Sequence, residues 1–511
     1  MRLNLDDLPR DTALLHQLVR DLIAEKDQRD SEIDKLRLII KQLQRGQFGR
    51  RSERLDADQL HLGLEELDAD IARAESRQVG PPGTKAEQAD KPGRLSFPEH
   101  LPREEVTLDV DDGMCRHCGG PLHEIGVTTS EMLDWVPASF RVMRIRRPKH
   151  GCRACGTVHQ VPAPERLIAK GMATPALVAQ VLVNKYCDHS PLYRQAQIFA
   201  RHGIELDRST LANWVGNACW WLEPLQAALA NKVFASSKLF ADDTPIPVLD
   251  PGRGRTKTGR LWVYTRDDRP WNGPDPPAAV YFYSPDRKAE RPASHLANFS
   301  GVLQVDGYAG FERLTSKGVV LAACWAHARR KFYEIHEGTG SPIAAETLRR
   351  IAALYGVEER IRGRAAEERR LMREIESKPI IKAMKPWLEQ GLARIPPGGA
   401  LAEAIRYALS RWPALCRFLD DGRIDIDNNP VERAIRPIAL GRKNHLFAGS
   451  DGGGERWAMI CSLIATAKLN GVEPYAYLKD LLERMAAGHP AHSLDELLPW
   501  NWHSSPTSTG N

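Results

Sequence analysis

The sequence predicts a multidomain α+β protein with an α/β core, and three observations predict it. Five short apolar segments, each followed by turn residues, indicate strands in the middle of the chain. Stretches with helical periodicity lie before, after and between them. Two Cys-x-x-Cys pairs indicate a small module ahead of the sheet. Because 511 residues is long for one domain, several units are expected.

The composition is that of an ordinary globular protein. Hydrophobic residues make up 42% of the chain and charged residues 27%, and a net charge of +5 neither requires nor excludes a nucleic-acid partner. No apolar run approaches the ~18 residues of a membrane span, and residues 1–10 carry acids where a signal peptide needs an apolar core. We therefore expect a cytoplasmic protein with no membrane partner. The unpaired cysteines fit a reduced cytosol; they are Cys187, Cys219, Cys324, Cys416 and Cys461.

The N-terminal segment, residues 1–47, is expected to be one helix with a heptad repeat of leucines. Arg29 interrupts the repeat, so two interpretations stay open: a short, dimeric, leucine-zipper-like coiled coil, and a helix packed on its own protein. Residues 48–100 follow with a basic, turn-like motif and stretches rich in Gly and Pro. That composition cannot bury a core, so a flexible linker is expected there.

Residues 101–165 are expected to form a zinc-binding domain. Two thiolate pairs on tight turns match a tetrahedral structural zinc site, whose ligands would be Cys115, Cys118, Cys152 and Cys155. A redox role is the weaker alternative, because one pair could be catalytic but hardly both. A strand-like segment between the pairs is basic and includes Arg144, Arg146 and Arg147. It suits contacts to DNA phosphates, and a solvated edge strand protected by charge explains it equally well.

Residues 166–235 are expected to be helical. Ser190-Pro191 opens one helix, Gly203 lies after its end, and Asp207 or Ser209 caps the next helix. Two short helices joined by a turn with glycine are compatible with a DNA-binding helix-turn-helix. Helical pairs without that role are common, so both interpretations stay open.

Residues 236–455 carry the predicted core. Its strands are expected at 238–244, 260–265, 279–283, 301–308 and 319–324. A short helix at 291–299 precedes the fourth strand, and a helix at 325–336 follows the fifth. This order is ribonuclease-H-like. A large helical insertion is expected at about 327–420, and a glycine-rich loop at 449–454. The C-terminal tail at 456–511 is expected to be helical, with a core stripe of Ile460, Leu463, Ile464 and Ala467.

Three acids are candidates for chemistry at this sheet. Asp242 lies on the first strand, Asp306 ends the fourth, and Glu432 lies in the first turn of a helix with Asn429 as its N-cap. Such carboxylates converge at one end of a sheet, where their oxygens suit Mg²⁺ or Mn²⁺. Two such ions about 3.5–4 Å apart would clamp an in-line displacement at phosphorus. The alternative for Glu432 is a capping box on the Asn429 amide.

Other residues near these acids have two interpretations each. Arg433 and Arg436 follow Glu432 on the same helix and would bind flanking phosphates, or would form an exposed helical face. Cys324 and His327 form a Cys-x-x-His pair where the fifth strand meets its helix. The pair would be half of a metal site, but the sequence indicates no second half. His327 would then contact substrate, or would pack or cap the helix.

Four motifs of the core resemble the insertion-sequence-66 family of bacterial transposases. They lie at residues 241–245, 303–308, 324–332 and 427–433. The N-terminal zipper, the motif at 48–53, the paired cysteines and the C-terminal tail are also similar to that family, so the resemblance covers nearly the whole chain. It implies that Asp242, Asp306 and Glu432 are the catalytic acids. The family usually has Glu after the first Asp, whereas Asp243 stands here, which leaves the choice between Asp242 and Asp243 open.

The resulting hypothesis is a nucleoid-associated DNA transposase of the DDE type. It would bind the terminal inverted repeats of its element, cut there and join the freed ends to target DNA with Mg²⁺. The zipper would make a homodimer or higher oligomer, and the resemblance implies accessory proteins encoded by the same element. The alternatives are a junction resolvase of the same fold, a catalytically silent, transposase-derived DNA-binding regulator, and a zinc-binding scaffold.

Overall fold

A computed structural model describes residues 171–250, 255–445 and 447–503, together with residues 140, 150–151, 158–159 and 166–168. The predicted zipper and linker, the four paired cysteines, and Arg144, Arg146 and Arg147 lie outside the described residues. The chain divides into two compact units, and residues 160–511 belong to the larger unit. In the smaller unit, β1 (His150–Gly151) pairs antiparallel with β2 (Val158–His159).

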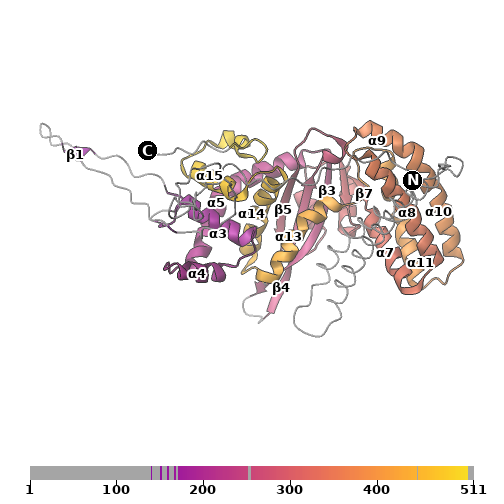
Figure 1. Ribbon diagram of the computed structural model, residues 1–511, viewed down its shortest axis with the longest axis horizontal. Helices are drawn as coiled ribbons and strands as arrows, with labels where there is room; N and C mark the ends of the chain where they lie inside the picture. The colour runs from indigo at the N-terminus through magenta and orange to yellow at the C-terminus, as the bar shows by residue number, and fades with distance from the viewer. Residues whose placement is uncertain are drawn as a thin grey trace, which may run out of the picture. The chain divides into compact units, whose positions relative to one another are not determined.

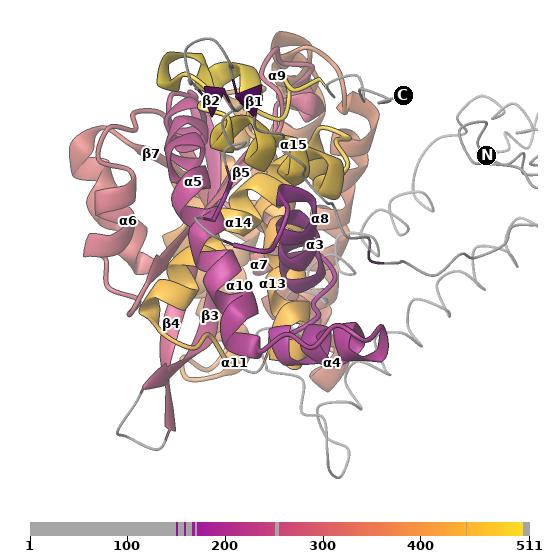
Figure 2. The same cartoon turned by 90° about the vertical axis from the view of Figure 1, so that its left-hand side faces the viewer.

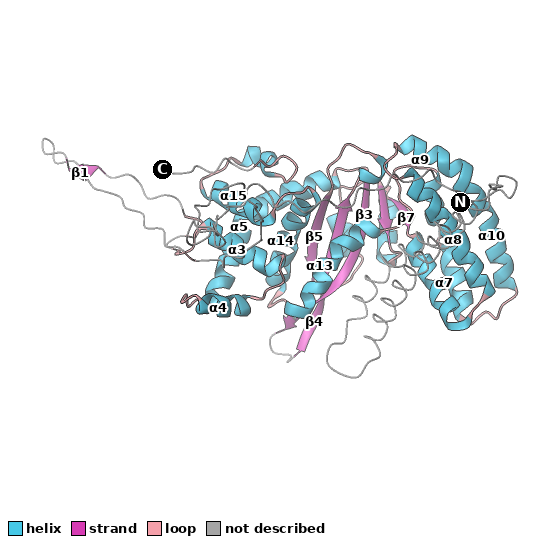
Figure 3. Cartoon of the chain, viewed as in Figure 1, coloured by secondary structure: helices cyan, strands magenta, loops and turns pink. Residues whose placement is uncertain are grey.

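A five-stranded mixed sheet forms the middle of the larger unit (Figure 3). Its order is β5-β4-β3-β6-β7. β3, β4 and β5 are antiparallel neighbours, whereas β6 runs parallel to β3 and β7 runs parallel to β6. The bounds are β3 Lys238–Asp250, β4 Arg255–Arg266, β5 Ala278–Ser284, β6 Val302–Val305 and β7 Val320–Ala323. All five predicted strands are therefore present, in the predicted order along the chain.

The prediction that the first strand ends at its acids is wrong, because β3 continues to Asp250. It pairs residue for residue with β4 along this length, up to Asp250 opposite Arg255. Pro245 and Pro247 are tolerated in β3 because β6 pairs only with Lys238–Ala241 and leaves the rest of that edge without a partner strand. Asp242 consequently lies within a strand.

The two faces of the sheet carry different helices (Figure 2). On one face lies α13 (Asn429–His445), where the Tyr281 hydroxyl donates to the Ala434 carbonyl at 2.7 Å. On the other face lie α6 (Glu290–His295) and the 3₁₀ helix η3 (Ala309–Lys317). There the Trp262 ring meets the Phe311 ring edge-on at 6.0 Å. Because side chains alternate along a strand, neighbouring residues of β3 point toward different helices.

The outer edge of β5 is covered by α14 (Asp451–Leu469). The Ser462 hydroxyl accepts from the Tyr281 amide at 2.9 Å, and the Thr466 hydroxyl accepts from the Ala279 amide at 3.1 Å. The Thr466 hydroxyl also donates to the Ala279 carbonyl. Side chains thereby satisfy backbone groups that a further strand would otherwise pair.

The glycine run predicted as a loop belongs to α14. Ser450 caps the helix by accepting from the Gly453 amide at 3.1 Å. A Cβ at Gly454 would lie 2.5 Å from the Tyr283 ring, so the close approach of helix and strand needs glycine there. The predicted core stripe of this helix is buried; it is Ile460, Leu463, Ile464 and Ala467.

Helices near the two ends of the described chain share one hydrophobic core with the sheet. They are α3 (Pro175–Tyr186), α4 (Leu192–Arg201), α5 (Arg208–Phe234) and α15 (Pro474–Ala486). Asp207 precedes α5 as predicted, but α5 is not short: it has 27 residues and packs against β5 and α14. Its length comes from a buried stripe that continues to Val233. Whether α4 and α5 bind DNA stays a prediction.

Six described helices lie beyond β7 (Figure 1) and surround a second hydrophobic core. Its helices are α7 (Trp325–Thr339), α8 (Pro342–Ile361), α9 (Ala366–Met372), α10 (Lys378–Ala393), α11 (Ala400–Ser410) and α12 (Trp412–Cys416). A short π-helix, Arg373–Ser377, joins α9 to α10. The stretch predicted as an insertion is therefore helical. Within the described residues, no helix is both long and apolar enough to cross a membrane.

Short 3₁₀ turns complete the described elements; they are Arg269–Trp271, Arg417–Leu419 and Ala491–Leu497.

Candidate active site

Asp242 and Asp243 point to opposite faces of the sheet. Asp242 lies opposite Val263, which lies opposite Tyr281, and Tyr281 contacts α13. Asp243 lies opposite Trp262, on the face covered by η3. Only Asp242 therefore shares a face with the helix that carries Glu432. Its Oδ1 accepts from the Asp243 amide at 2.6 Å, which fixes the side-chain orientation.

Asp243 is held in a cage of two guanidinium groups. Arg260 lies 3.1 Å from one carboxylate oxygen and Arg287 lies 2.9 Å from the other, and the Asp243 side chain is 1% exposed. Burial raises the pKa of Asp243, and the two arginines oppose that rise. These contacts give Asp243 a structural role on the far face of the sheet.

Asp306 lies directly after β6, beside Asp242. Val305 is the register partner of Ala241 in the parallel β3–β6 pair, so the next position on each strand is an aspartate. The Asp306 Oδ1 accepts from the Tyr308 amide at 2.9 Å, and its carbonyl accepts from the Tyr407 hydroxyl at 3.0 Å. Gly307 follows with a φ of 105°, a conformation that favours glycine.

Glu432 lies in the first turn of α13 and is 2% exposed. The prediction of Asn429 as the N-cap is wrong by one residue: α13 begins at Asn429, and the Asn428 carbonyl accepts from the Glu432 amide at 3.4 Å. The reason is Asp427, whose carboxylate accepts from the Asn429 amide at 3.3 Å. That contact occupies the amide on which the expected capping box depends.

The loop before α13 is tied to three other elements. Gln304 of β6 contacts the backbone on both sides of this loop, accepting from the Asp425 amide at 2.9 Å and donating to the Asp427 carbonyl at 3.1 Å. The Asn428 side chain donates to the Ala241 carbonyl of β3 at 3.2 Å. The Trp325 amide of α7 donates to the Ile426 carbonyl at 2.9 Å. The position of Glu432 is thereby fixed relative to β3, β6 and α7.

Glu432 lies beside Cys324 and His327, a grouping that the sequence does not indicate. The candidate ligand atoms of these three residues all lie within 4.8 Å of one another. The distance from Glu432 Oε1 to His327 Nδ1 is 4.0 Å. Among the described residues, this is the group of His, Cys, Asp and Glu side chains with metal-binding spacing, and neither Asp242 nor Asp306 belongs to it. The Cys-x-x-His spacing was the available signal, and Glu432 is the third residue of the group.

Arg433 and Arg436 are exposed on α13. They extend from the same helix as Glu432, on the part of its surface that solvent reaches. Their positions allow contact with an extended polyanion that approaches this face of the sheet.

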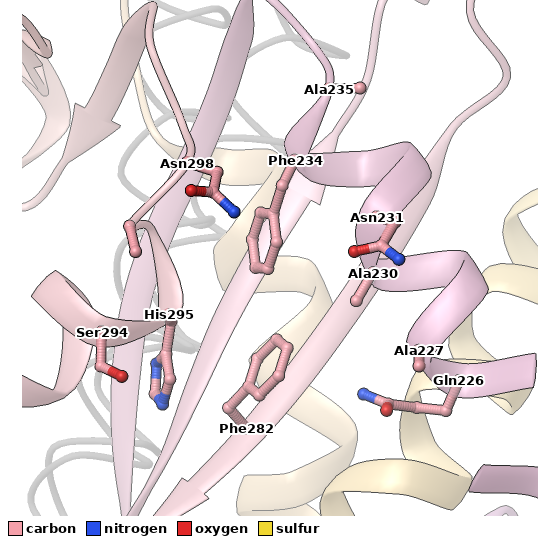
Figure 4. Close-up of a pocket in the computed structure, with 11 residues that line it drawn as sticks. Gln226, Ala227, Ala230, Asn231, Phe234, Ala235, Phe282, Ser294, His295 and Asn298 are labelled. Atoms are coloured by element: carbon pink, nitrogen blue, oxygen red, sulfur yellow. The ribbon is translucent and has the colours of Figure 1, made fainter. Parts of the chain in front are cut away.

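A separate cavity of about 480 Å³ lies on the other face of the sheet (Figure 4). Phe234 of α5, Phe282 of β5 and His295 of α6 line it, and the Phe282 and His295 rings stack at 4.7 Å. Phe282 lies opposite Trp262, so this cavity shares a face with Asp243. Burial lowers the pKa of His295 to about 4, so its ring is neutral at pH 7. The cavity does not belong to the site around Glu432.

Four family comparisons cover most of the chain. Residues 170–456 match the Transposase IS66 family, and residues 462–500 match the IS66 C-terminal element. Residues 112–156 match the zinc-finger binding domain of transposase IS66. Residues 35–106 match a segment described as Transposase C of IS166 homeodomain. The chain belongs to the IS66 family of transposases and is thus a transposase of an insertion sequence, with DNA as its partner.

Similar full-length proteins occur in Sinorhizobium fredii (strain NBRC 101917 / NGR234). The uncharacterized protein y4jD is 43% identical, with 98% of both chains covered. The uncharacterized protein y4qI is 41% identical over 95% of this chain and 92% of its own. The uncharacterized protein y4hP is 39% identical over 93% of this chain and 90% of its own.

The zinc-finger match contains both cysteine pairs and supports a structural zinc ion in that segment.

Proposed function

We propose that this transposase binds the terminal inverted repeats of its element and catalyses Mg²⁺-dependent strand cleavage and strand transfer. Its sheet would be a ribonuclease-H-like core, with Asp242, Asp306 and Glu432 as the catalytic acids. The strand order β5-β4-β3-β6-β7 supports this interpretation, because three antiparallel strands continue into two parallel ones. The family membership supports the reaction class.

One observation carries the choice of residues. Asp242 and Asp306 each follow the last register pair of β3 and β6, which is Ala241 with Val305, and Glu432 lies in the first turn of the helix that covers the Asp242 face. Three carboxylates are the oxygen donors that Mg²⁺ or Mn²⁺ takes, so the residues present fit such ions. When bound there, a divalent ion would polarise a phosphate oxygen and lower the pKa of a bound water or hydroxyl.

The surrounding residues would prepare this site. Backbone amides of Asp243 and Tyr308 hold the two aspartate carboxylates in fixed orientations, which limits the reorganisation needed on binding. Arg260 and Arg287 neutralise Asp243, so this third aspartate adds little repulsion beside Asp242. Arg433 and Arg436 would contact phosphates that flank the scissile one.

The other parts of the chain would bind and pair the element ends. The zinc module with Cys115, Cys118, Cys152 and Cys155, its basic residues, and the helices of 166–235 would contact the terminal repeats. The helix of residues 1–47 would join two or more protomers. Accessory proteins of the same element would act with this assembly. We also propose the domain boundaries that were predicted from the sequence.

The test compares full-length wild type with Glu432→Gln, using DNA that carries the element ends. Strand transfer is followed in Mg²⁺, and end binding is followed in parallel. We expect joined product from wild type, at least about 10³-fold less from Glu432→Gln, and equal binding, since one metal ligand is lost without a change in basic contacts. Glu389→Gln, at an exposed position of α10, is the matched control.

The outcomes separate the alternatives. Equal strand transfer by wild type and Glu432→Gln would remove Glu432 from catalysis. If wild type binds the ends and joins nothing, even with the accessory proteins, the chain would be a catalytically silent DNA-binding regulator.

A further inference from the structure

Three side chains of different chemistry meet at the base of α13. Cys324 supplies a thiol, His327 an imidazole and Glu432 a carboxylate, with their ligand atoms within 4.8 Å of one another. The cysteine and glutamate are buried, and the His327 side chain is 20% exposed. This arrangement leaves one accessible side, through which an ion could enter and a water molecule could complete its coordination.

Cys324 presents its sulfur atom to the loop before α13. Cys324 is the residue before α7, and its Sγ accepts from the Asn428 amide at 3.3 Å. His327 lies one turn further along the same helix, so Cys324 and His327 present their ligand atoms on one side of α7.

Hydrogen bonds also hold the cluster in place. They fix both ends of the helical segment that separates His327 from Glu432 in the sequence. The Trp325 amide donates to the Ile426 carbonyl at 2.9 Å, which ties the start of α7 to the loop before α13. The Asn428 side chain fixes the same loop to Ala241 of β3. A ligand set supported in this way loses little conformational freedom when an ion binds.

We propose that Cys324, His327 and Glu432 form a binding site for a zinc-class divalent metal ion, separate from the paired-cysteine zinc module. Thiolate, imidazole and carboxylate together are ligands of Zn²⁺, and three protein ligands plus water complete a tetrahedron. Mg²⁺ does not take sulfur, so this ligand set selects against the ion of the phosphoryl-transfer site. Binding displaces the thiol proton to solvent.

The site acts as a metal-dependent switch on the transposase, and this step rests on the proposed function. Glu432 belongs both to the sulfur-containing cluster and to the proposed set of catalytic acids. Its carboxylate cannot complete the Mg²⁺ site while it holds zinc beside Cys324. Bound zinc therefore withdraws one acid from the reaction, and chelation of that zinc returns it.

The first measurement is metal binding to the full chain. Wild type, Cys324→Ser, His327→Gln and Cys416→Ser are equilibrated with buffered Zn²⁺, and bound zinc is determined per chain. We expect wild type and Cys416→Ser to hold one more zinc than Cys324→Ser, and His327→Gln to bind that zinc more than about 10-fold more weakly. Cys416 is a half-buried free cysteine outside the cluster, which makes it the matched control. Circular dichroism of each variant checks its fold.

Cobalt provides the spectroscopic readout. Protein that holds zinc in the paired-cysteine module, with the Cys324 site empty, is titrated with Co²⁺. A sulfur-to-cobalt charge-transfer band is expected in wild type and His327→Gln, and its absence is expected in Cys324→Ser. Equal zinc content in wild type and Cys324→Ser, or an unchanged cobalt band in Cys324→Ser, would overturn the site.

The second measurement is strand transfer in Mg²⁺ with increasing free Zn²⁺, each protein being compared with its own zinc-free rate. Wild type and Cys416→Ser should be inhibited and then restored by a chelator, and the inhibitory zinc concentration should rise at least about 10-fold in His327→Gln. Equal zinc sensitivity of wild type and His327→Gln would overturn the switch. If wild type joins no DNA under any condition, the proposed function fails, and the binding data alone decide the metal site.

Discussion

The guanidinium of Arg287 lies 2.9 Å from the carboxylate of Asp243, on the sheet face opposite to Glu432. The same guanidinium lies over the Tyr308 ring, 4.2 Å from its centre. Arg287 thus links β3 to the segment that follows Asp306. This contact distinguishes the roles of two adjacent aspartates that the sequence alone presents as equivalent.

Asp242→Asn and Asp243→Asn should therefore behave differently. Asp242→Asn should abolish strand transfer with little change in the free energy of unfolding, because it removes a proposed metal ligand and keeps the volume. Asp243→Asn should lower the free energy of unfolding by about 3 kcal/mol, since it leaves Arg260 and Arg287 facing a neutral group in a buried site. Urea unfolding and strand transfer are measured on both variants.

The two variants are each other's control, since both replace Asp by Asn at neighbouring positions of one strand. Loss of activity in Asp243→Asn without loss of stability, together with an active Asp242→Asn, would reverse the assignment.

Asp425 should make unfolding pH-dependent in acid. Burial alone would raise the pKa of Asp425, but Lys238 and Arg369 outweigh it and hold the pKa at about 2, below the ordinary value of 3.8. The resulting stability is fully present above about pH 4 and is lost as the pH falls through about 2. The difference corresponds to about 2 kcal/mol. Free energies of unfolding between pH 6 and 2 should fall more steeply for wild type than for Asp425→Asn.

Asp425→Asn itself should cost about 3 kcal/mol at pH 7, because Arg369 loses a partner at 2.8 Å while remaining 2% exposed. Glu403→Gln, on α11, carries the same type of change outside this cluster and should leave the pH profile unchanged. Parallel pH profiles of wild type and Asp425→Asn would contradict the prediction.

The hydroxyl groups of α14 should stabilise the edge of β5. In a Ser462→Ala, Thr466→Val double variant, the amides of Tyr281 and Ala279 lose their acceptors, at a cost of about 2 kcal/mol in total. Hydrogen exchange should accelerate at these two amides more than at the rest of the sheet. Thr339→Val, at an exposed hydroxyl near the end of α7, is the control. Unchanged exchange at both amides would contradict this role.

Arg433→Gln and Arg436→Gln should weaken DNA binding without changing stability. Each lost phosphate contact should reduce the slope of log affinity against log salt by about 1, similarly for specific and unrelated sequences. Arg394→Gln, at an exposed position beyond α10, should leave the slope unchanged. Binding titrations at several salt concentrations measure this. An unchanged slope in both α13 variants would assign these arginines to a solvated surface.

Much of the core could be predicted from sequence because its signals are local. Apolar runs bounded by turn residues identified all five strands, and helical periodicity identified the helices between β7 and α13. Asp306 was correctly expected at a strand end, since the apolar run stops directly before it. The buried stripe of α14 followed from its 3.6-residue period.

The errors arose where tertiary contacts override local preference. Acids and prolines in β3 are poor strand formers, yet pairing with β4 carries the strand through them. The start of α13 moved by one residue because Asp427, and not Glu432, accepts from the Asn429 amide. The length of α5 depends on its burial against β5 and α14, which helix propensity does not indicate.

The meeting of Cys324 and His327 with Glu432 could not be predicted without the fold. The Cys-x-x-His pair is visible in the sequence, but Glu432, the third residue of the group, comes only after the helices α7 to α12 in the chain. Only the contact between the start of α7 and the loop before α13 brings them together.

The Trp325–Ile426 hydrogen bond also shows where the chain departs from and returns to the sheet. The helices between these two residues pack around the second hydrophobic core, which Val302, Ala322 and Ala323 of the sheet also join, and the helical segment begins and ends at one point. A segment with adjacent ends can change in length, or be exchanged for another domain, without moving the strands it interrupts. Such a junction lets evolution alter what surrounds the acids while the sheet that carries two of them stays as it is.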